Sequence, residues 1–324
     1  MAGASRPHPA ELTLLRCVFF GTPEFAVPSL ERLADAAEVS LVVTSPDKPV
    51  GRHADPVPSP VARAAIRRNL AIDQPAKLRG NDAFLARLRD ASPDLAVVVA
   101  YGKILPFAVL DLPPLGCVNV HASLLPRHRG ASPVQTAILA GDSETGVSTM
   151  RLVEELDAGP VYLERRVPIR PREDAGSLSA RLAAAGAGLL GETLAGLETG
   201  TLVPRPQEGT PTWCRTIRRD DGEADWSRPA AELDRRLRAF TPWPGLFTFL
   251  GAERVKILEA DVGPPGDFSD PGKFRMAEGA LAVQAGAGTS LLVGRLQREG
   301  KKPVTAAEFA ASAGPAARFG SRPA

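Results

Sequence analysis

The sequence predicts an α/β domain built on a mostly parallel sheet, followed by a small antiparallel β-barrel domain. Three observations lead to this prediction. Over roughly the first two thirds of the chain, short β-branched runs alternate with helical patterns. Pro204, Pro206, Gly209 and Pro211 then crowd into one short stretch, which is typical of a surface linker. Beyond it, short strand-like runs are separated by turns rich in glycine or proline, as in a small barrel.

The first elements follow βαβ order. A strand is predicted for residues 14–20 (LLRCVFF) and another for residues 38–44 (EVSLVVT), with Leu30 and Leu33 on a helix between them. Residues 94–100 (DLAVVVA) are nearly continuous in apolar residues, as in a strand covered on both faces of a parallel sheet. We therefore expect this run to be a central strand.

The next elements continue the alternation. Strands are predicted for residues 116–120 and 146–152, with the helical stretch SPVQTAILAG between them. A long helix opens near Ser177 and ends before Gly200, because Leu178, Leu182, Ala185 and Leu189 recur at helical spacing.

After the boundary, residues 227–240 (SRPAAELDRRLRAF) predict one amphipathic helix. Leu233, Leu237 and Phe240 form its buried stripe, and we expect three arginines to lie away from that stripe: Arg235, Arg236 and Arg238. The runs LFTFL, RVKILEA, LAVQA and SLLVGRL then supply the strands of the barrel.

Composition excludes several protein classes. The 324 residues are 44% hydrophobic and 23% charged, which is ordinary globular usage and not that of a disordered chain. The formal net charge of +2 is too small for a polybasic protein. The three cysteines are far apart and form no C-x-x-C, so we expect neither a disulfide framework nor a zinc site. Lys103 and Pro106 interrupt the longest apolar run, so we expect no membrane span and a cytoplasmic location.

Common cofactor and nucleophile motifs are missing. The turn after the first strand reads GTPEFA, with one glycine where a dinucleotide fingerprint needs three. No Walker sequence and no G-x-S-x-G elbow occurs. Redox chemistry and acyl-serine chemistry are therefore disfavoured.

His121 is the most informative of the four histidines, because it directly follows a predicted strand. The carboxyl ends of strands are where open α/β folds bind ligands, and Asn119, two residues earlier, points to the same side. An amide and an imidazole together can polarise a carbonyl oxygen, and Asp157 is a candidate for the carboxylate that supports the imidazole's charge. The structural alternative is that Asn119 caps a strand and Asp157 begins a turn, and spacing and composition do not decide between the two.

A longer motif gives these residues a context. Residues 116–135, GCVNVHASLLPRHRGASPVQ, closely resemble the signature of enzymes that transfer formyl from 10-formyltetrahydrofolate. Residues 144–160, ETGVSTMRLVEELDAGP, resemble the second signature of that superfamily, and its aspartate is Asp157 here. Within the superfamily the chain resembles the methionyl-tRNA formyltransferases through FFGTPEFAVPSLERL, SPDKPVGR, VVVAYGKILP, FTPWPG and GKKPVTAAEFA.

The resemblance implies a fold and a division into domains. It implies a Rossmann-like formyltransferase domain over residues 1–204, a linker over 205–222 and a barrel of the oligonucleotide-binding type over 223–324. It also implies catalysis by Asn119, His121 and Asp157 without a metal, with 10-formyltetrahydrofolate as cosubstrate. Two segments are implied to bind the folate: Gly102, Lys103, Ile104 and Leu105, and Ser123, Leu124, Leu125 and Pro126.

The implied partner is initiator methionyl-tRNA, bound by a protein that we expect to be a monomer. Candidate tRNA contacts are Arg52, Arg127, Arg129, Arg215, Arg218, Lys301 and Lys302, with Arg235, Arg236, Arg238 and Arg298 as further surface candidates. The sequence departs from the family after Arg52, where His53, Ala54 and Asp55 replace a stretch that commonly bears lysines. Arginines at 215, 218 and 219 stand where the family tends to have lysines, which keeps the charge but changes its geometry.

Three other functions share these features. An amino-sugar nucleotide formyltransferase or a 10-formyltetrahydrofolate hydrolase of the same superfamily would use the same three catalytic residues. An RNA-binding protein on a catalytically dead α/β domain is the non-enzymatic alternative. The elements GTPEFAVPSL and GKILP favour the enzyme that acts on tRNA.

Overall fold

The computed structural model describes residues 14–49, 55–266, 270–314 and 318–321. The chain forms two compact units, each assembled from three segments. The first comprises Met1–His121, Ser148–Arg165 and Ala183–Gln207, and the second comprises Ala122–Val147, Arg166–Leu182 and Glu208–Ala324. The predicted division at residues 204 and 222 remains a prediction.

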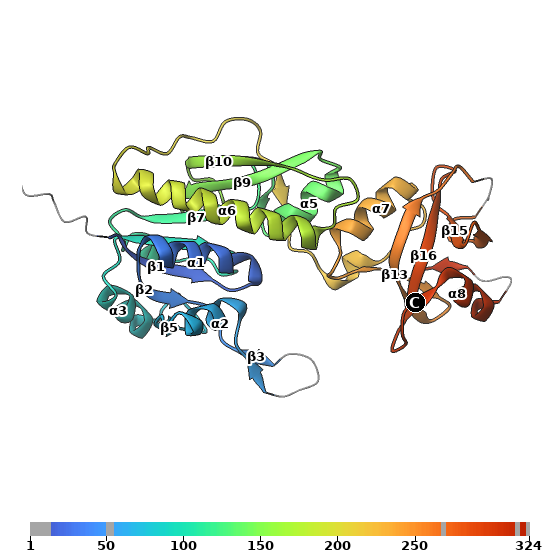
Figure 1. Ribbon diagram of the computed structural model, residues 1–324, viewed down its shortest axis with the longest axis horizontal. Coiled ribbons are helices and arrows are strands. Elements are labelled where there is room, and N and C mark those ends of the chain that lie inside the picture. Colours follow the sequence, from blue (N-terminus) through green and yellow to red (C-terminus); the bar gives the residue numbers. More distant parts are fainter. Residues whose placement is uncertain (1–13, 50–54, 267–269, 315–317, 322–324) are drawn as a thin grey trace, which may run out of the picture. The chain divides into compact units, whose positions relative to one another are not determined.

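A seven-stranded sheet organises the first unit, in the order β10-β9-β7-β6-β1-β2-β5 (Figure 1). β6 pairs in parallel with both β1 and β7, whereas β9 runs antiparallel to β7. The expected central strand is confirmed, because β6 is fourth in the order. The strands are β1 (Arg16–Gly21), β2 (Glu38–Val43), β5 (Ile72–Asp73), β6 (Leu95–Val99), β7 (Cys117–His121), β9 (Glu144–Arg151) and β10 (Val161–Pro168).

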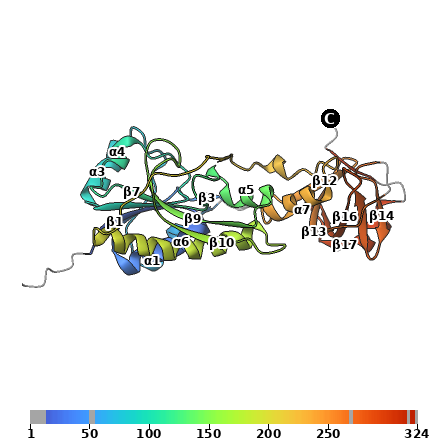
Figure 2. The same cartoon turned by 90° about the horizontal axis from the view of Figure 1, so that it is seen from above.

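Helices cover both faces of this sheet, which is why the inner strands β1 and β6 are apolar on both sides. In β1, Cys17 and Phe19 pack in one core cluster with α1 (Val27–Ala36), α2 (Pro60–Arg67) and α6 (Ala175–Glu198). Val18 and Phe20 pack in another with α3 (Asp82–Asp90) and α4 (Phe107–Leu110). Figure 2 shows α1 and α6 on one side of the sheet and α3 and α4 on the other.

The second unit contains an antiparallel sheet in the order β14-β15-β16-β13-β12-β18, with β17 paired to β16. Its core includes Val255, Ile257, Leu291, Val293 and Phe319, and the helices α7 (Ala230–Ala239) and α8 (Ala306–Ala313) contribute Leu233 and Phe309 to it. The predicted fold class, a Rossmann-like domain followed by a small barrel-like β-sheet domain, is thus confirmed. The strands are β12 (Leu246–Leu250), β13 (Glu253–Val262), β14 (Phe274–Ala277), β15 (Ala280–Gln284), β16 (Ser290–Arg298), β17 (Val304–Thr305) and β18 (Phe319–Gly320).

The second unit also includes α5 (Pro133–Ala140), which ends at Gly141 in the left-handed conformation, and several short elements. The short strands β8 (Arg129–Gly130) and β11 (Trp213–Cys214) pair in parallel, and η2 is a short 3-10 helix (Arg219–Gly222). The short antiparallel pair formed by β3 (Lys48–Pro49) and β4 (Pro56–Val57) belongs to the first unit.

The arginines of α7 lie off its buried stripe, as predicted, but two of them are only partly exposed and bind protein groups. Arg236 donates to the carbonyls of Asp221 and Glu223, and burial lowers its pKa. Arg238 pairs with Asp234 and donates to the carbonyl of Glu173. The long side chain of an arginine lets its stem pack on the helix surface while the guanidinium reaches acceptors beyond it.

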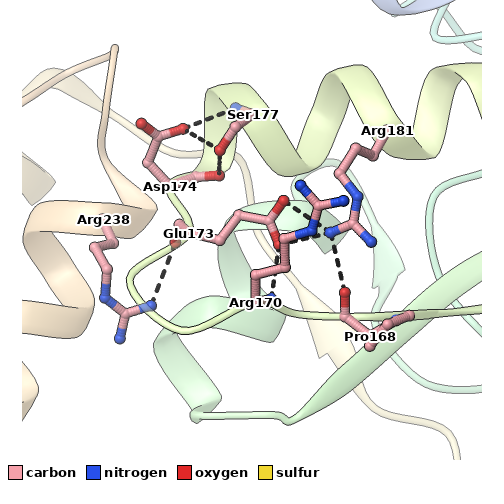
Figure 3. Close-up of polar contacts among 7 residues, drawn as sticks. All are labelled: Pro168, Arg170, Glu173, Asp174, Ser177, Arg181 and Arg238. Carbon is pink, nitrogen blue, oxygen red and sulfur yellow. Dashed lines mark hydrogen bonds and ion pairs between the residues drawn. The ribbon is translucent and has the colours of Figure 1, made fainter.

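Glu173 lies in the loop before α6 and its carboxylate is almost fully buried (Figure 3). Both carboxylate oxygens accept from Arg181 at 2.8 Å, and one also accepts the backbone N–H of Arg170 at 2.8 Å. Asp174 then caps the helix by accepting the N–H of Ser177 at 2.7 Å. A buried carboxylate that accepts three hydrogen bonds is compatible with folding because its hydrogen-bonding capacity is largely satisfied.

Candidate active site

Asn119 and His121 share one face of β7. Successive side chains of β7 point to opposite faces of the sheet. Val118 and Val120 pack in the core with α1 and α6, whereas Cys117 packs in the core on the other face. Asn119 and His121 follow Cys117 at intervals of two and lie on its side of the sheet. Both are buried, and the register places Asn119 beside Met150 and His121 beside Ser148 of β9.

Asp157 reaches His121 from the loop between β9 and β10. Its carboxylate oxygen Oδ2 lies 3.9 Å from Nδ1 of His121, and both side chains are about nine-tenths buried. Asp157 has φ +50°, a left-handed conformation that aspartate tolerates better than most residues. The structure thus brings Asp157 and His121 together, and their catalytic roles stay a prediction.

Two residues that sequence reasoning missed hold the Asp157 turn. Gln207 donates from Nε2 to the carbonyls of both Asp157 and Gly159, each at 2.8 Å. Gly159 lies so close to the backbone that a Cβ there would be 1.8 Å from the carbonyl oxygen of Arg151. Gly159 could have been found from the D-A-G-P motif, whereas Gln207 gave no signal because it lies in the proline-rich stretch interpreted as a linker.

The predicted folate segment at Gly102 to Leu105 follows β6 at the same sheet edge, since β6 and β7 are parallel neighbours. Gly102 has φ +79°, and Ile104 is 87% exposed although apolar. Lys103 donates from Nζ to the carbonyls of Pro75 and Ala76, and burial, with the nearby charge of Lys48, lowers its pKa. The segment therefore offers backbone groups and an apolar side chain rather than a free ammonium.

The second predicted folate segment, Ser123 to Pro126, belongs to the second unit. Ser123 is fully buried and donates from Oγ to the carbonyl of Arg127 at 2.6 Å. Leu125 and Pro126 are buried and Leu124 is half-buried. The carbonyl of Pro126 accepts the N–H of Thr212, which ties this segment to the chain near Thr212.

The predicted tRNA contacts differ widely in exposure. Arg218, Lys301 and Lys302 are exposed, while Arg52 lies outside the described residues, as do His53 and Ala54. Arg127 is half-exposed and pairs with Asp142 at 2.7 Å. Arg215 is exposed and forms two hydrogen bonds to Asp221, which lower the pKa of that carboxyl. Arg129 is buried beside the ring of Trp213, 5.5 Å from its centroid.

Within the described part of the chain, no three histidine, cysteine, aspartate or glutamate side chains gather in a way that could hold a metal ion. The helices of the same residues include none that is long and apolar enough to cross a membrane.

Comparison with protein families identifies both parts of the chain. The family described as formyl transferase matches residues 15–194, and the formyl transferase C-terminal domain matches residues 216–314. The methionyl-tRNA formyltransferase of Thermus thermophilus is 46% identical over 309 residues, which cover 94% of this chain and 99% of that protein. The enzyme of the same name from Myxococcus xanthus is 47% identical over 297 residues, covering 91% of this chain and 94% of that protein.

Solved structures resemble the fold at much lower identity. HypX from Aquifex aeolicus, in complex with tetrahydrofolic acid, has a TM-score of 0.60 at 17% identity, covering 91% of this chain and 46% of that one. WlaRD, a sugar 3N-formyl transferase, has a TM-score of 0.62 at 15% identity, covering 89% of this chain and 99% of that one. Identities this low support the fold alone.

Proposed function

Because this chain belongs to the formyl transferase family, and to the methionyl-tRNA formyltransferases within it, we propose that it formylates initiator methionyl-tRNA. The formyl group comes from 10-formyltetrahydrofolate, and the acceptor is the α-amino group of the esterified methionine. The products are formylmethionyl-tRNA and tetrahydrofolate. The observation that carries the proposal is a sequence identity of more than 40% to methionyl-tRNA formyltransferases over nearly the whole chain. The buried pair of His121 and Asp157, with Asn119 on the same strand as His121, is consistent with it.

The proposed reaction is a direct attack of the amine on the formyl carbon. The new carbon–nitrogen bond converts the formyl oxygen to an oxyanion, which the Asn119 amide and the imidazolium of His121 stabilise by hydrogen bonding and charge. These two side chains share one face of a rigid strand, so they are oriented before the substrate binds. When the intermediate collapses, the bond to N10 of the folate breaks and N10 takes up a proton.

Asp157 is assigned two roles in this scheme. Its carboxylate, 3.9 Å from Nδ1, supports the positive charge of His121, and it helps to steer the proton that the amine nitrogen loses after it has attacked the formyl carbon. Gln207 and Gly159 keep the carboxylate at this place, because they fix the backbone on which it is carried.

The remaining assignments follow from the family. We propose that the folate contacts the backbone of Gly102 to Leu105 and the turn Ser123 to Pro126. We propose further that the C-terminal domain contributes to binding the tRNA, and that the protein acts as a cytoplasmic monomer.

The acceptor decides between this function and its alternatives. Purified protein is given labelled 10-formyltetrahydrofolate together with methionyl initiator tRNA, a UDP-amino-sugar or water alone. Transfer of the label to the tRNA is the expected result. Label on the sugar would identify an amino-sugar formyltransferase, and label in formate would identify a hydrolase. No turnover with any acceptor would favour a non-catalytic RNA-binding protein.

A further inference from the structure

A small cavity on the antiparallel sheet of the second unit has cations as four of its seven lining residues. It has a volume of about 170 Å³, and its lining residues come from η2, from β13 and from the end of β16. Four side chains are cationic and one is a carboxylate: Arg219, Arg254, Lys256, Arg298 and Glu299, with Gln297 and Gly300 completing the lining. Since a water molecule occupies about 30 Å³, this space can hold a phosphate-sized anion.

The strand register explains why these cations gather. Along β13, Val255 and Ile257 are buried in the core, so Arg254 and Lys256 face outward on the opposite side. Gln297 of β16 lies directly across from Lys256. Arg219 approaches from η2, a separate element. Burial lowers the pKa of Arg254, and the repulsion of Arg219 lowers it further.

Arg254 is held in place and is incompletely satisfied. Its guanidinium stacks over the ring of Phe247, with 3.7 Å from the guanidinium carbon to the ring centroid. Its Nε is buried and has no hydrogen-bond partner. A buried donor without an acceptor costs free energy, which the folded protein bears at this position.

The other charged side chains of the cavity differ in whether they already have a partner within the protein. Arg298 is already paired with Glu253 and donates to Ser312. Glu299 lines the cavity, and Asp220 and Glu223 act on Arg254 from outside the lining, so some positive charge is offset. Arg219 and Lys256 are exposed and form no ion pair within the described residues. The cations available to a ligand are therefore Arg219, Arg254 and Lys256.

We propose that this cavity binds a backbone phosphate of the tRNA, with Arg254 as a fixed fork and Arg219 and Lys256 as flanking charges. The inference rests on the proposed function and specifies where the second unit holds its nucleic acid. It adds Arg254 and Lys256, which the sequence had not singled out, to Arg298, a predicted contact, and Arg219, an arginine that keeps the charge of a family lysine. Lys301 and Lys302 do not line the cavity.

The test compares tRNA binding by the full chain and by Arg219→Ala/Lys256→Ala across a range of salt concentrations. Both residues are exposed, so their removal leaves the core intact, and unfolding in urea checks this. We expect binding at about 0.1 M salt to weaken about ten-fold and the slope of log Kd against log salt to fall by roughly one. Lys273→Ala, an exposed lysine outside the cavity, is the matched control and should leave both values unchanged.

Two further measurements complete the test. Lys256→Arg should restore most of the affinity lost in Lys256→Ala, because it returns the charge. Inorganic pyrophosphate, added at constant ionic strength, should compete with tRNA on the parent and much less on the double variant. Identical slopes for parent and double variant would overturn the proposal, and pyrophosphate binding without any change in tRNA affinity would instead assign the cavity to a free phosphate. Formylation of methionyl-tRNA by the parent is measured separately. If the parent formylates the tRNA while the slopes are identical, only this site is wrong. If the parent does not formylate the tRNA, the proposed function itself fails.

Discussion

At the scale of single residues, the proposed mechanism depends on the amide of Asn119 and the imidazole of His121 on β7. We expect Asn119→Ala and His121→Ala each to lower kcat by about 100-fold or more, because each removes a group that stabilises the oxyanion. Folate affinity, measured by fluorescence titration, should change little, since folate binding is assigned to other segments. Near-normal turnover in either variant would remove the proposed mechanism.

Asp157 is expected to act through the charge of His121. In Asp157→Asn the imidazolium loses its counterion, so formylation should fall by about 100-fold at pH 7. Asp35→Asn, a surface carboxylate paired with Arg68, is the control and should behave as the parent. Equal activity of Asp157→Asn and the parent from pH 6 to 8 would reduce Asp157 to a turn residue.

Gln207 is a positioning residue in this account. Gln207→Ala removes both hydrogen bonds that fix the Asp157 turn, so the carboxylate should be displaced from His121. We expect kcat to fall about ten-fold while the KM for folate stays nearly constant. A purely structural role would instead lower the free energy of unfolding and leave kcat unchanged, so both are measured on the same preparation.

The loop before α6 gives a prediction at the scale of elements. Glu173→Gln removes the charge that Arg181 contacts through both carboxylate oxygens, and the site is almost fully buried. Urea denaturation should show a loss of about 2–3 kcal/mol. The control is Glu192→Gln, which breaks the exposed pair with Arg165 and should cost less than about 1 kcal/mol. Equal losses in the two variants would contradict a buried, structural role for Glu173.

The elements that the sequence predicted best are those with long apolar patterns. Residues 94–100 were identified as a central strand because both faces are apolar, and β6 is buried throughout. Short elements such as α4 and β5 were not predicted, since a few residues carry no periodicity to recognise. The backbone carbonyls that accept from Arg236 and Arg238 were also unpredictable, because Asp221 and Glu173 lie far from them in the sequence.

The candidate site was predictable to the extent that its residues share one strand. Asn119 and His121 lie two positions apart, so the strand period alone puts them on one face. The place of Asp157 beside His121 came from the resemblance, and only the structure gives their distance. Gln207 could not be assigned from the sequence, because its role depends on the chain returning to the Asp157 turn.

For the whole molecule, the buried cysteines predict how stability changes with pH. Burial raises the pKa of Cys17 and of Cys117 to about 12. An unfolded cysteine has a pKa of about 8.5, so the unfolded chain holds fewer protons than the folded chain between these values. The stability contributed by the neutral thiols is therefore complete below about pH 8.5 and is lost as the pH rises toward about 12.

This loss is measurable by urea denaturation at pH 7, 9 and 10. The free energy of unfolding should fall by roughly 1 kcal/mol per pH unit for each thiol above pH 9. Cys17→Ala/Cys117→Ala should be less stable at pH 7 but show a shallower decline. A decline as steep in the double variant as in the parent would show that other groups cause it.

The central claim, that the chain formylates initiator methionyl-tRNA, is tested most directly by acceptor competition in a single vessel. Labelled 10-formyltetrahydrofolate is mixed with the full chain, methionyl initiator tRNA and a UDP-amino-sugar in water, and the products are separated after nuclease digestion. The account predicts that the label is recovered as formylmethionyl-adenosine and that His121→Ala abolishes most of this product. Label recovered chiefly as formate or on the sugar, with the tRNA unlabelled, would contradict it.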